Sequence, residues 1–195
     1  MIYRRPLEND YSQMLALQNR NLVWELTPEE AKQGCLLRAF SLDDFRAMDA
    51  ELCVMLAFNA DQQLAGYLCA TRLIENSRFE VIQRIYQHCK KVSYHGKSLL
   101  QYKAFIASPM CIERAYRGTS LFFDLCSEML KSPQITSDYE LILTFVSVDN
   151  MQSLRACRRL SFQPIEIFNI KDLRYWLLVQ EINLQVERKL VIQRG

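Results

Sequence analysis

The stretch IERAYRGTSLFFDLCSEML, from Ile112 to Leu130, decides the fold of this chain. It reads as the end of an apolar strand, a tight loop that contains Gly118, and then an amphipathic helix. The first backbone N–H groups of a helix have no partner within it, and the positive end of the helix dipole lies behind them. The stretch therefore predicts a binding site for an anion such as a pyrophosphate.

The residue types along this stretch fit the prediction. Arg117 and Gly118 open the loop, and Thr119 and Ser120 add hydroxyl groups. The helix that follows carries its buried stripe at helical spacing, formed by Leu121, Phe122, Leu125 and Met129. An arginine-glycine pair before a helix occurs in many loops, so the interpretation depends on a second segment.

That segment is TFVSVDNMQSLRACRRLSFQPIEIF, residues 144–168. A β-branched and aromatic strand, Leu141 to Val148, leads to Asp149 and Asn150, which are both suited to cap a helix. A short helix is expected through Arg159, and a new strand from about Phe162. The two segments together give the order strand, anion loop, helix, strand, polar turn, helix, strand.

This order resembles the GNAT superfamily of acyl-CoA-dependent N-acyltransferases, and so do the residues. YRGTSLFFDL is similar to that family's pyrophosphate loop, and DNMQSLRACRRLSF is similar to its Asn-x-x-Ser…Gly-Phe helix. The resemblance covers residues 100–182 well and the N-terminal half in outline. It implies an α/β fold with a mixed, mostly antiparallel twisted sheet of about six to seven strands, flanked by helices and splayed at the fourth and fifth strands.

The resemblance also implies where acetyl-CoA or coenzyme A binds. The backbone of Met110, Cys111 and Ile112 is expected to pair with the amides of the pantetheine arm, as an added strand would. Asn150 is expected to reach the pantetheine or phosphate side, and it can cap its helix at the same time. The pyrophosphate is expected on the backbone N–H groups of Arg117, Gly118, Thr119, Ser120, Leu121 and Phe122.

The sequence departs from the family's pattern at positions that matter for chemistry. Ser120 and Phe122 stand where the family usually has glycine, and glycine or alanine. Cys157 stands where many members carry a tyrosine that acts as general acid. A thiol with an unperturbed pKa of about 8.5 can protonate a departing thiolate, so Cys157 is the candidate catalytic residue. The alternative is that Cys157 only fills the core beside Leu154 and Leu160.

Composition agrees with a single domain, residues 1–195, in a reducing compartment. Half of the 195 residues are hydrophobic, and the formal charge of +2 is too small to indicate a nucleic-acid or membrane partner. The start MIYRRPLEND lacks the apolar run of a signal peptide, so a cytoplasmic location is expected. The seven cysteines are scattered without Cys-x-x-Cys spacing, and with only two histidines no metal site is expected.

The first half of the chain predicts the remaining family elements. The expected strands are Met1 to Arg5, Leu52 to Phe58 and Gln63 to Ile74, and the expected helices start at Asp10, Thr27 and Ser41. Residues 25–51 contain seven acids against three bases. In relatives the helices of this region form a wall of the acceptor site, so these acids could bind a cationic amine substrate. The alternative is that they form a solvated acidic face.

Residues 76–100 lie between two expected strands where a short turn would be enough, and they form a predicted helical insertion. Apolar residues recur at helical spacing, so Asn76 or Ser77 is expected to cap a helix that runs to about Lys91. The polar stretch after it, residues 93–98, is expected to border the acceptor opening, with Tyr94 or His95 contacting substrate. The alternative is that the apolar stripe packs against a second copy in a homodimer.

The sequence thus predicts an N-acetyltransferase that moves an acetyl group from acetyl-CoA to a primary amine of a small molecule or peptide. The first alternative is a GNAT-like module that binds acyl-CoA with little catalysis, as Ser120, Phe122 and Cys157 would permit. A structural domain without any cofactor would require the phosphate loop to be vestigial.

Overall fold

A seven-stranded mixed sheet forms the centre of this computed structural model, which describes residues 1–31, 34–136 and 139–182. The strand order is β1-β2-β3-β6-β7-β9-β8, and each neighbouring pair is antiparallel except β6 and β7. The strands are β1 (Ile2–Arg4), β2 (Cys53–Phe58), β3 (Leu64–Arg72), β6 (Ala104–Ile112), β7 (Leu141–Ser147), β8 (Gln163–Ile170) and β9 (Leu173–Glu181). The predicted mixed, mostly antiparallel sheet is confirmed.

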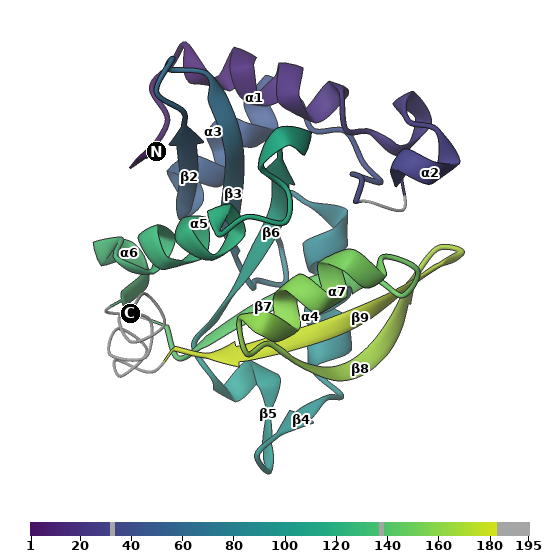
Figure 1. Cartoon of the computed structure of the whole chain (residues 1–195). Helices are drawn as coiled ribbons and strands as arrows, with labels where there is room; N and C mark the ends of the chain where they lie inside the picture. Colours follow the sequence, from purple (N-terminus) through teal and green to yellow (C-terminus); the bar gives the residue numbers. More distant parts are fainter. Residues whose placement is uncertain (32–33, 137–138, 183–195) are drawn as a thin grey trace.

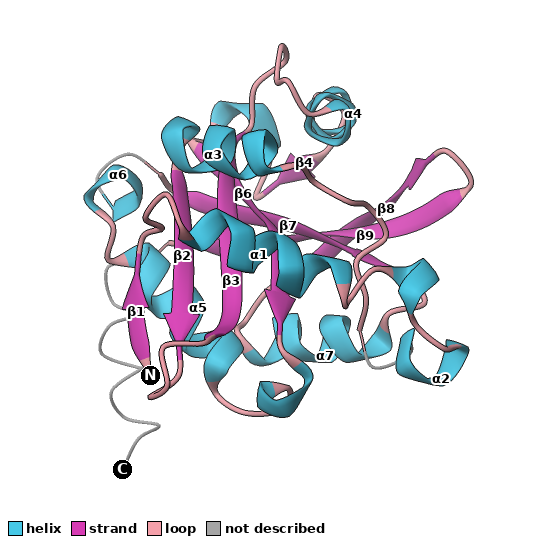
Figure 2. Ribbon diagram, turned by 90° about the horizontal axis from the view of Figure 1, so that it is seen from above, coloured by secondary structure: helices cyan, strands magenta, loops and turns pink. Residues whose placement is uncertain are grey.

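Helices cover both faces of this sheet (Figure 1). The first face carries α1 (Asp10–Asn19), α3 (Leu42–Glu51) and α4 (Glu80–Cys89), and the second carries α5 (Leu121–Leu130) and α7 (Met151–Arg159). Figure 2 shows α4 and α7 on opposite sides of β7, β9 and β8. The short elements are η1 (Val23–Glu25), α2 (Pro28–Ala31), η2 (Leu99–Gln101), η3 (Arg114–Tyr116), α6 (Pro133–Thr136) and the hairpin of β4 (Ser93–Tyr94) and β5 (Lys97–Ser98).

Strand β2 illustrates why a strand of this sheet can be a continuous apolar run in the sequence. Each of its residues is buried, and their side chains alternate between two cores. Val54 and Leu56 point into the core under α1, α3 and α4, whereas Cys53 and Met55 point into the core under α5 and α7. A strand covered on both faces needs no polar side, so the alternation of a half-exposed strand is missing.

Helix α3 begins where its sequence predicts. Ser41 accepts a hydrogen bond from the backbone N–H of Asp44 at 3.1 Å, and the Asp44 carboxylate accepts from the backbone N–H of Ser41 at 2.9 Å. This reciprocal pair is a capping box, and it satisfies two backbone donors that a helix start leaves without partners. Local sequence therefore fixes this boundary.

The predicted start of α4 at Asn76 or Ser77 is wrong by several residues. The helix begins at Glu80, and Phe79 occupies the capping position without a side-chain hydrogen bond. The Ser77 hydroxyl accepts from the Phe79 N–H at 3.3 Å, and the Ser77 carbonyl accepts from Gln83 Nε2 at 2.7 Å. The buried Phe79 ring anchors the helix start, while the apolar stripe docks on the domain as expected.

Gly66 is required where β3 passes β6. A Cβ atom at this position would lie 3.1 Å from the backbone oxygen of Cys111 and 3.3 Å from Ile112 Cγ1. Both atoms belong to the neighbouring strand, which cannot move without disturbing the ladder between the strands. Glycine therefore allows the close approach of β3 to the part of β6 that borders the candidate site.

We predict that Gly66→Ala lowers the free energy of unfolding by about 1–3 kcal/mol, because the added methyl group overpacks the strand pair. Urea denaturation of the variant and the wild type measures the difference. Gly96→Ala is the matched control: a Cβ there meets no atom within 4 Å, although its φ of +76° adds backbone strain. Equal stability of Gly66→Ala and the wild type would contradict the packing argument.

Candidate functional site

The sheet opens between β6 and β7. The two strands pair in parallel only through Ala104–Ile106 and Leu141–Leu143. Beyond these pairs β6 continues along β3 and β7 continues along β9, so the two strands part. The Thr144 hydroxyl donates to the carbonyl oxygen of Ala107 at 2.9 Å, at the point of separation. The predicted splay of the fourth and fifth main-sheet strands is confirmed.

An irregularity in β6 lies directly at this opening. The register between β3 and β6 shifts between Leu68 and Ala70, and the extra residues on β6 include Ser108 and Pro109, which are joined by a cis peptide bond. A bulge of this kind bends a strand and turns its next groups. The bulge therefore decides which backbone groups of β6 face the opening.

The backbone hydrogen bonds between β3 and β6 show which of the three residues predicted to contact the pantetheine arm face the opening. The Glu113 N–H donates to the Ala65 carbonyl at 2.9 Å, so this pair is hydrogen-bonded. Alternation then directs the backbone of Cys111 toward β3 and that of Met110 and Ile112 toward the opening. The Cys111 side chain is buried in the core as well. Met110 and Ile112 can therefore pair with an added chain, and Cys111 cannot.

Arg117 does not direct its side chain to a phosphate. Its guanidinium donates to the carbonyl oxygen of Ile112 at 3.1 Å, to that of Gly34 at 3.0 Å, and to Asn21 Oδ1 at 2.5 Å. Its backbone N–H donates to the Arg114 carbonyl at 3.2 Å. Burial lowers the pKa of the guanidinium. The arginine thus ties β6 to the chain on the first face of the sheet.

The loop after Arg117 still presents a row of backbone donors. Gly118 adopts a φ of +78°, a conformation that glycine reaches without strain. The Leu121 N–H donates to the Thr119 hydroxyl at 3.2 Å. Within the residues that the structure describes, the N–H groups of residues 118–120, 122 and 123 have no hydrogen-bond partner. These donors at the start of α5 can bind an anion, and the row extends one residue beyond the predicted Phe122.

One acid near this row was missed by the sequence reasoning. Asp124 accepts from the Ser120 hydroxyl at 2.9 Å and from the Tyr3 hydroxyl at 3.0 Å. An acid in the first turn stabilises the helix dipole, and it also adds negative charge beside the anion site. Its position in the first turn was the available signal; its link to Tyr3 on β1 depends on the tertiary fold.

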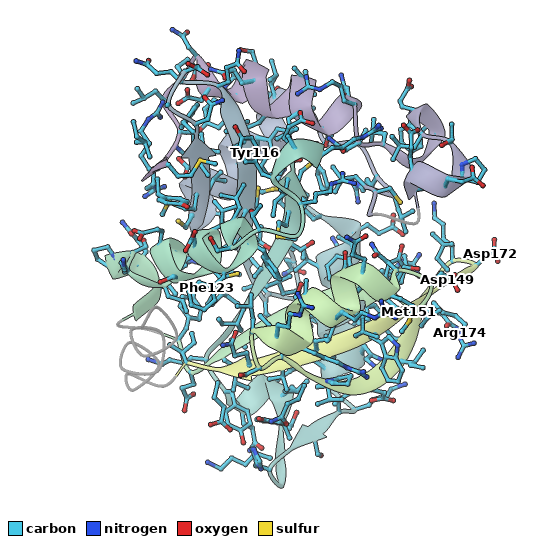
Figure 3. All side chains as sticks on the ribbon, viewed as in Figure 1. Tyr116, Phe123, Asp149, Met151, Asp172 and Arg174 are labelled. Atoms are coloured by element: carbon cyan, nitrogen blue, oxygen red, sulfur yellow. The ribbon has the colours of Figure 1, made fainter. Side chains whose placement is uncertain are left out.

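A cavity of about 730 Å³ occupies the opening and reaches both faces of the sheet. On the second face it is lined by Phe122, Cys126, Asn150, Ser153 and Cys157, which belong to α5 and α7. On the first face its lining includes Leu36, Leu37, Arg38, Phe40, Val81, Ile170, Lys171, Leu173 and Tyr175. Asp149 also lines it, and Figure 3 shows Asp149 and Met151 near the hairpin tip at Asp172. A ligand in this cavity can therefore extend from one face to the other.

Asn150 caps its helix as expected, and its contact with the cofactor stays a prediction. Its Oδ1 accepts from the Ser153 N–H at 3.0 Å and caps α7. The same residue lines the cavity, so its amide NH₂ group can donate to a ligand there.

Cys157 lies in the cavity wall, but its environment makes it a poor acid. The residue is 4 % exposed, and burial raises the pKa of its thiol to about 12. Burial also raises the pKa of Cys126, which lines the same cavity. A thiol with such a pKa is a weak proton donor to a thiolate whose own thiol has an ordinary pKa of about 8.5. The geometry favours packing for Cys157.

Tyr94 and His95 lie away from the cavity. The Tyr94 hydroxyl donates to Glu181 Oε1 at 3.1 Å, and His95 Nε2 lies 3.2 Å from the same oxygen. Glu181 ends β9, whereas Tyr175 at the cavity lies near the start of that strand. The expectation that residues 93–98 border the acceptor opening is therefore not met, because side-chain contacts hold this hairpin at the other end of β9.

The acids of residues 25–51 also serve other purposes. None of the seven lines the cavity as the structure describes it. Glu30 pairs with Arg114, Asp49 pairs with Arg5, and the Asp44 carboxylate caps α3. The interpretation as a cationic-amine site therefore receives no support from these positions.

No group of three histidine, cysteine or acidic residues that could hold a metal ion occurs in the described ranges. In those ranges no helix combines the length and the apolar character needed to cross a membrane.

No family model and no curated protein matches the sequence. Solved structures do match, at low identity. Arabidopsis thaliana NAA60 in complex with a bisubstrate analogue is 14% identical over 93% of this chain and 98% of its own, with a TM-score of 0.63. Salmonella typhimurium yncA with its cofactor acetyl-CoA is 13% identical over 94% of each chain, with a TM-score of 0.61.

An acetyltransferase of the GNAT family from Streptococcus pneumoniae is 14% identical over 93% of this chain and 99% of its own, with a TM-score of 0.59. The chain has the GNAT fold. Identities of this size show the fold, so the reaction has to be argued from the site.

We predict that Ser120→Glu raises the dissociation constant for acetyl-CoA about tenfold or more, because it places a second carboxylate among the N–H donors at the start of α5. Isothermal titration calorimetry measures the change. Ser127→Glu, later on the same helix, is the matched control and should bind acetyl-CoA like the wild type. Unchanged affinity of Ser120→Glu would place the cofactor elsewhere.

Proposed function

We propose that this protein transfers an acyl group, specifically acetyl from acetyl-CoA, to the amine of a small molecule or peptide. One observation carries the proposal: the cavity at the opening of β6 and β7 joins the start of α5 on one face of the sheet to an apolar wall on the other. A donor bound by its diphosphate at α5 would present its thioester to an acceptor that enters from the first face.

The backbone groups at the opening support this placement of the donor. The N–H and C=O of Met110 and the N–H of Ile112 can pair with pantetheine amides, as in the addition of a strand. The Ile112 carbonyl already accepts from Arg117 Nε. The diphosphate would accept from the N–H groups of residues 118–120, 122 and 123, and Asn150 would donate from its amide.

The transfer itself would require little covalent chemistry from the protein. The neutral amine nitrogen attacks the thioester carbon, a C–N bond forms, the C–S bond breaks, and the amine loses one proton while the thiolate gains one. Holding the two reactants in line supplies about 7–11 kcal/mol of the barrier reduction in favourable cases. The apolar part of the cavity would limit competing hydrolysis, and solvent at its mouth would exchange the protons.

The rival function is an acyl-CoA-binding module. Ser120 and Phe122 leave less room for a phosphate than glycine would, and the raised pKa of Cys157 makes it a weak proton donor. Such a module would use the same cavity and would release no coenzyme A. The parted strands favour the transferase, because they open the donor side to the first face of the sheet.

We predict that acetyl-CoA binds with about 1:1 stoichiometry and that a panel of primary amines includes acceptors that release free thiol. A disulfide reagent that reports free thiol measures the release. Cys157→Ala should keep turnover within about threefold of the wild type, because a buried thiol with a raised pKa is a weak acid. Binding without thiol release from any amine would establish the rival module; absence of binding would reject both functions.

A further inference from the structure

Two cations lie on the acceptor side of the cavity. Arg38 belongs to the segment before α3, and Lys171 belongs to the tip of the β8–β9 hairpin; both line the cavity. Within the described residues, neither side chain lies within ion-pair distance of an acid. The Arg38 guanidinium lies over the Phe40 ring, 5.3 Å from its centroid. Two segments far apart in sequence thus bring unpaired cations to one place.

The backbone at Lys171 adds a second observation. Its φ of +53° lies in the left-handed region, which residues with a branched or long side chain seldom adopt. Ile170 and Leu173 pair on either side of it, so the tight turn holds this conformation. Glycine or asparagine would suit the turn better. The turn thus fixes the place of Lys171 in the cavity wall.

The one acid on this side is already neutralised. Glu80 lines the cavity, and its carboxylate accepts from Arg84 Nε at 3.0 Å and Nη2 at 2.7 Å. The Arg84 hydrogen bond is the main cause that lowers the pKa of Glu80, and the charges of Lys171 and Arg38 lower it further. Three cations therefore surround one carboxylate. Asp149, at the start of α7 next to Asn150, also lines the cavity.

The wall between these cations and the opening of the sheet is apolar. It includes Leu36, Leu37, Val81, Ile170, Leu173 and Tyr175. A polycationic acceptor would meet repulsion from Arg38 and Lys171. An acceptor that fits has an amine at one end, an apolar body against this wall, and an anionic group for the cations.

We propose that the acceptor is an amino carboxylate with an apolar body, whose carboxylate binds Arg38 and Lys171. The proposal rests on the transferase function, since it names the acceptor class of that site. An arginine can bind a carboxylate with two parallel hydrogen bonds, and a lysine adds a point charge. The amine of the acceptor is then directed past the apolar wall toward the thioester.

The test compares matched pairs of probes by calorimetry: 5-aminopentanoate, 6-aminohexanoate and 8-aminooctanoate, each with its amide, against the protein saturated with coenzyme A. We expect the best carboxylate to bind at least about tenfold more tightly than its amide. Arg38→Gln and Lys171→Gln should each reduce this preference, and the double variant should remove it. Lys97→Gln, on the β4–β5 hairpin away from the cavity, should leave it unchanged.

A second variant at Lys171 distinguishes loss of the ammonium group from a folding defect at the hairpin tip. Lys171→Gly removes the ammonium group while relieving the left-handed backbone, so it should fold well and still show the reduced preference. Equal binding of carboxylates and amides, tighter binding of the amides, or failure of all probes to bind at millimolar concentration would overturn the proposal. A carboxylate preference without thiol release would support carboxylate binding by Arg38 and Lys171 and would reject the transferase function.

Discussion

The architecture depends on one constraint: β6 and β7 share only three paired residues before they part. Backbone N–H and C=O groups that lose their sheet partner must find another or face solvent. On β6, the Ile112 carbonyl accepts a hydrogen bond from the Arg117 guanidinium, and the Ala107 carbonyl accepts one from the Thr144 hydroxyl. The groups of Met110 keep their capacity to pair with a ligand. The cavity and its lining by α5 and α7 follow from this separation.

Arg117 connects the two sides of the site. Its side chain binds Ile112 on the strand that would pair with the donor, and Gly34 in the segment that leads to the acceptor wall. Its backbone begins the loop of N–H donors at α5. A single half-buried cation thus holds the loop before α5, the edge of β6 and the segment at Gly34 in one arrangement. The guanidinium charge is used to keep the site in shape.

Local patterns predicted most of the fold and part of the site. The capping box of Ser41 and Asp44, the β2–β3 hairpin and the loop before α5 each depend on neighbours in sequence, and each occurs as expected. The failures depend on tertiary contacts. Cys111 turns toward β3 because a bulge shifts the register, and Tyr94 is held by Glu181 at the distant end of β9. Arg38 and Lys171 come together only because the hairpin of β8 and β9 reaches the cavity, and no local pattern could place that hairpin.

The central claim is that a donor occupies the opening between β6 and β7, and amide-resolved hydrogen exchange with and without coenzyme A tests it most directly. The account predicts slower exchange for the amides of Met110, Ile112 and residues 118–120, 122 and 123, because each gains a hydrogen bond to the ligand. The amide of Tyr94 on the remote hairpin should exchange at the same rate in both states. Binding of coenzyme A with protection confined to other segments would contradict the account.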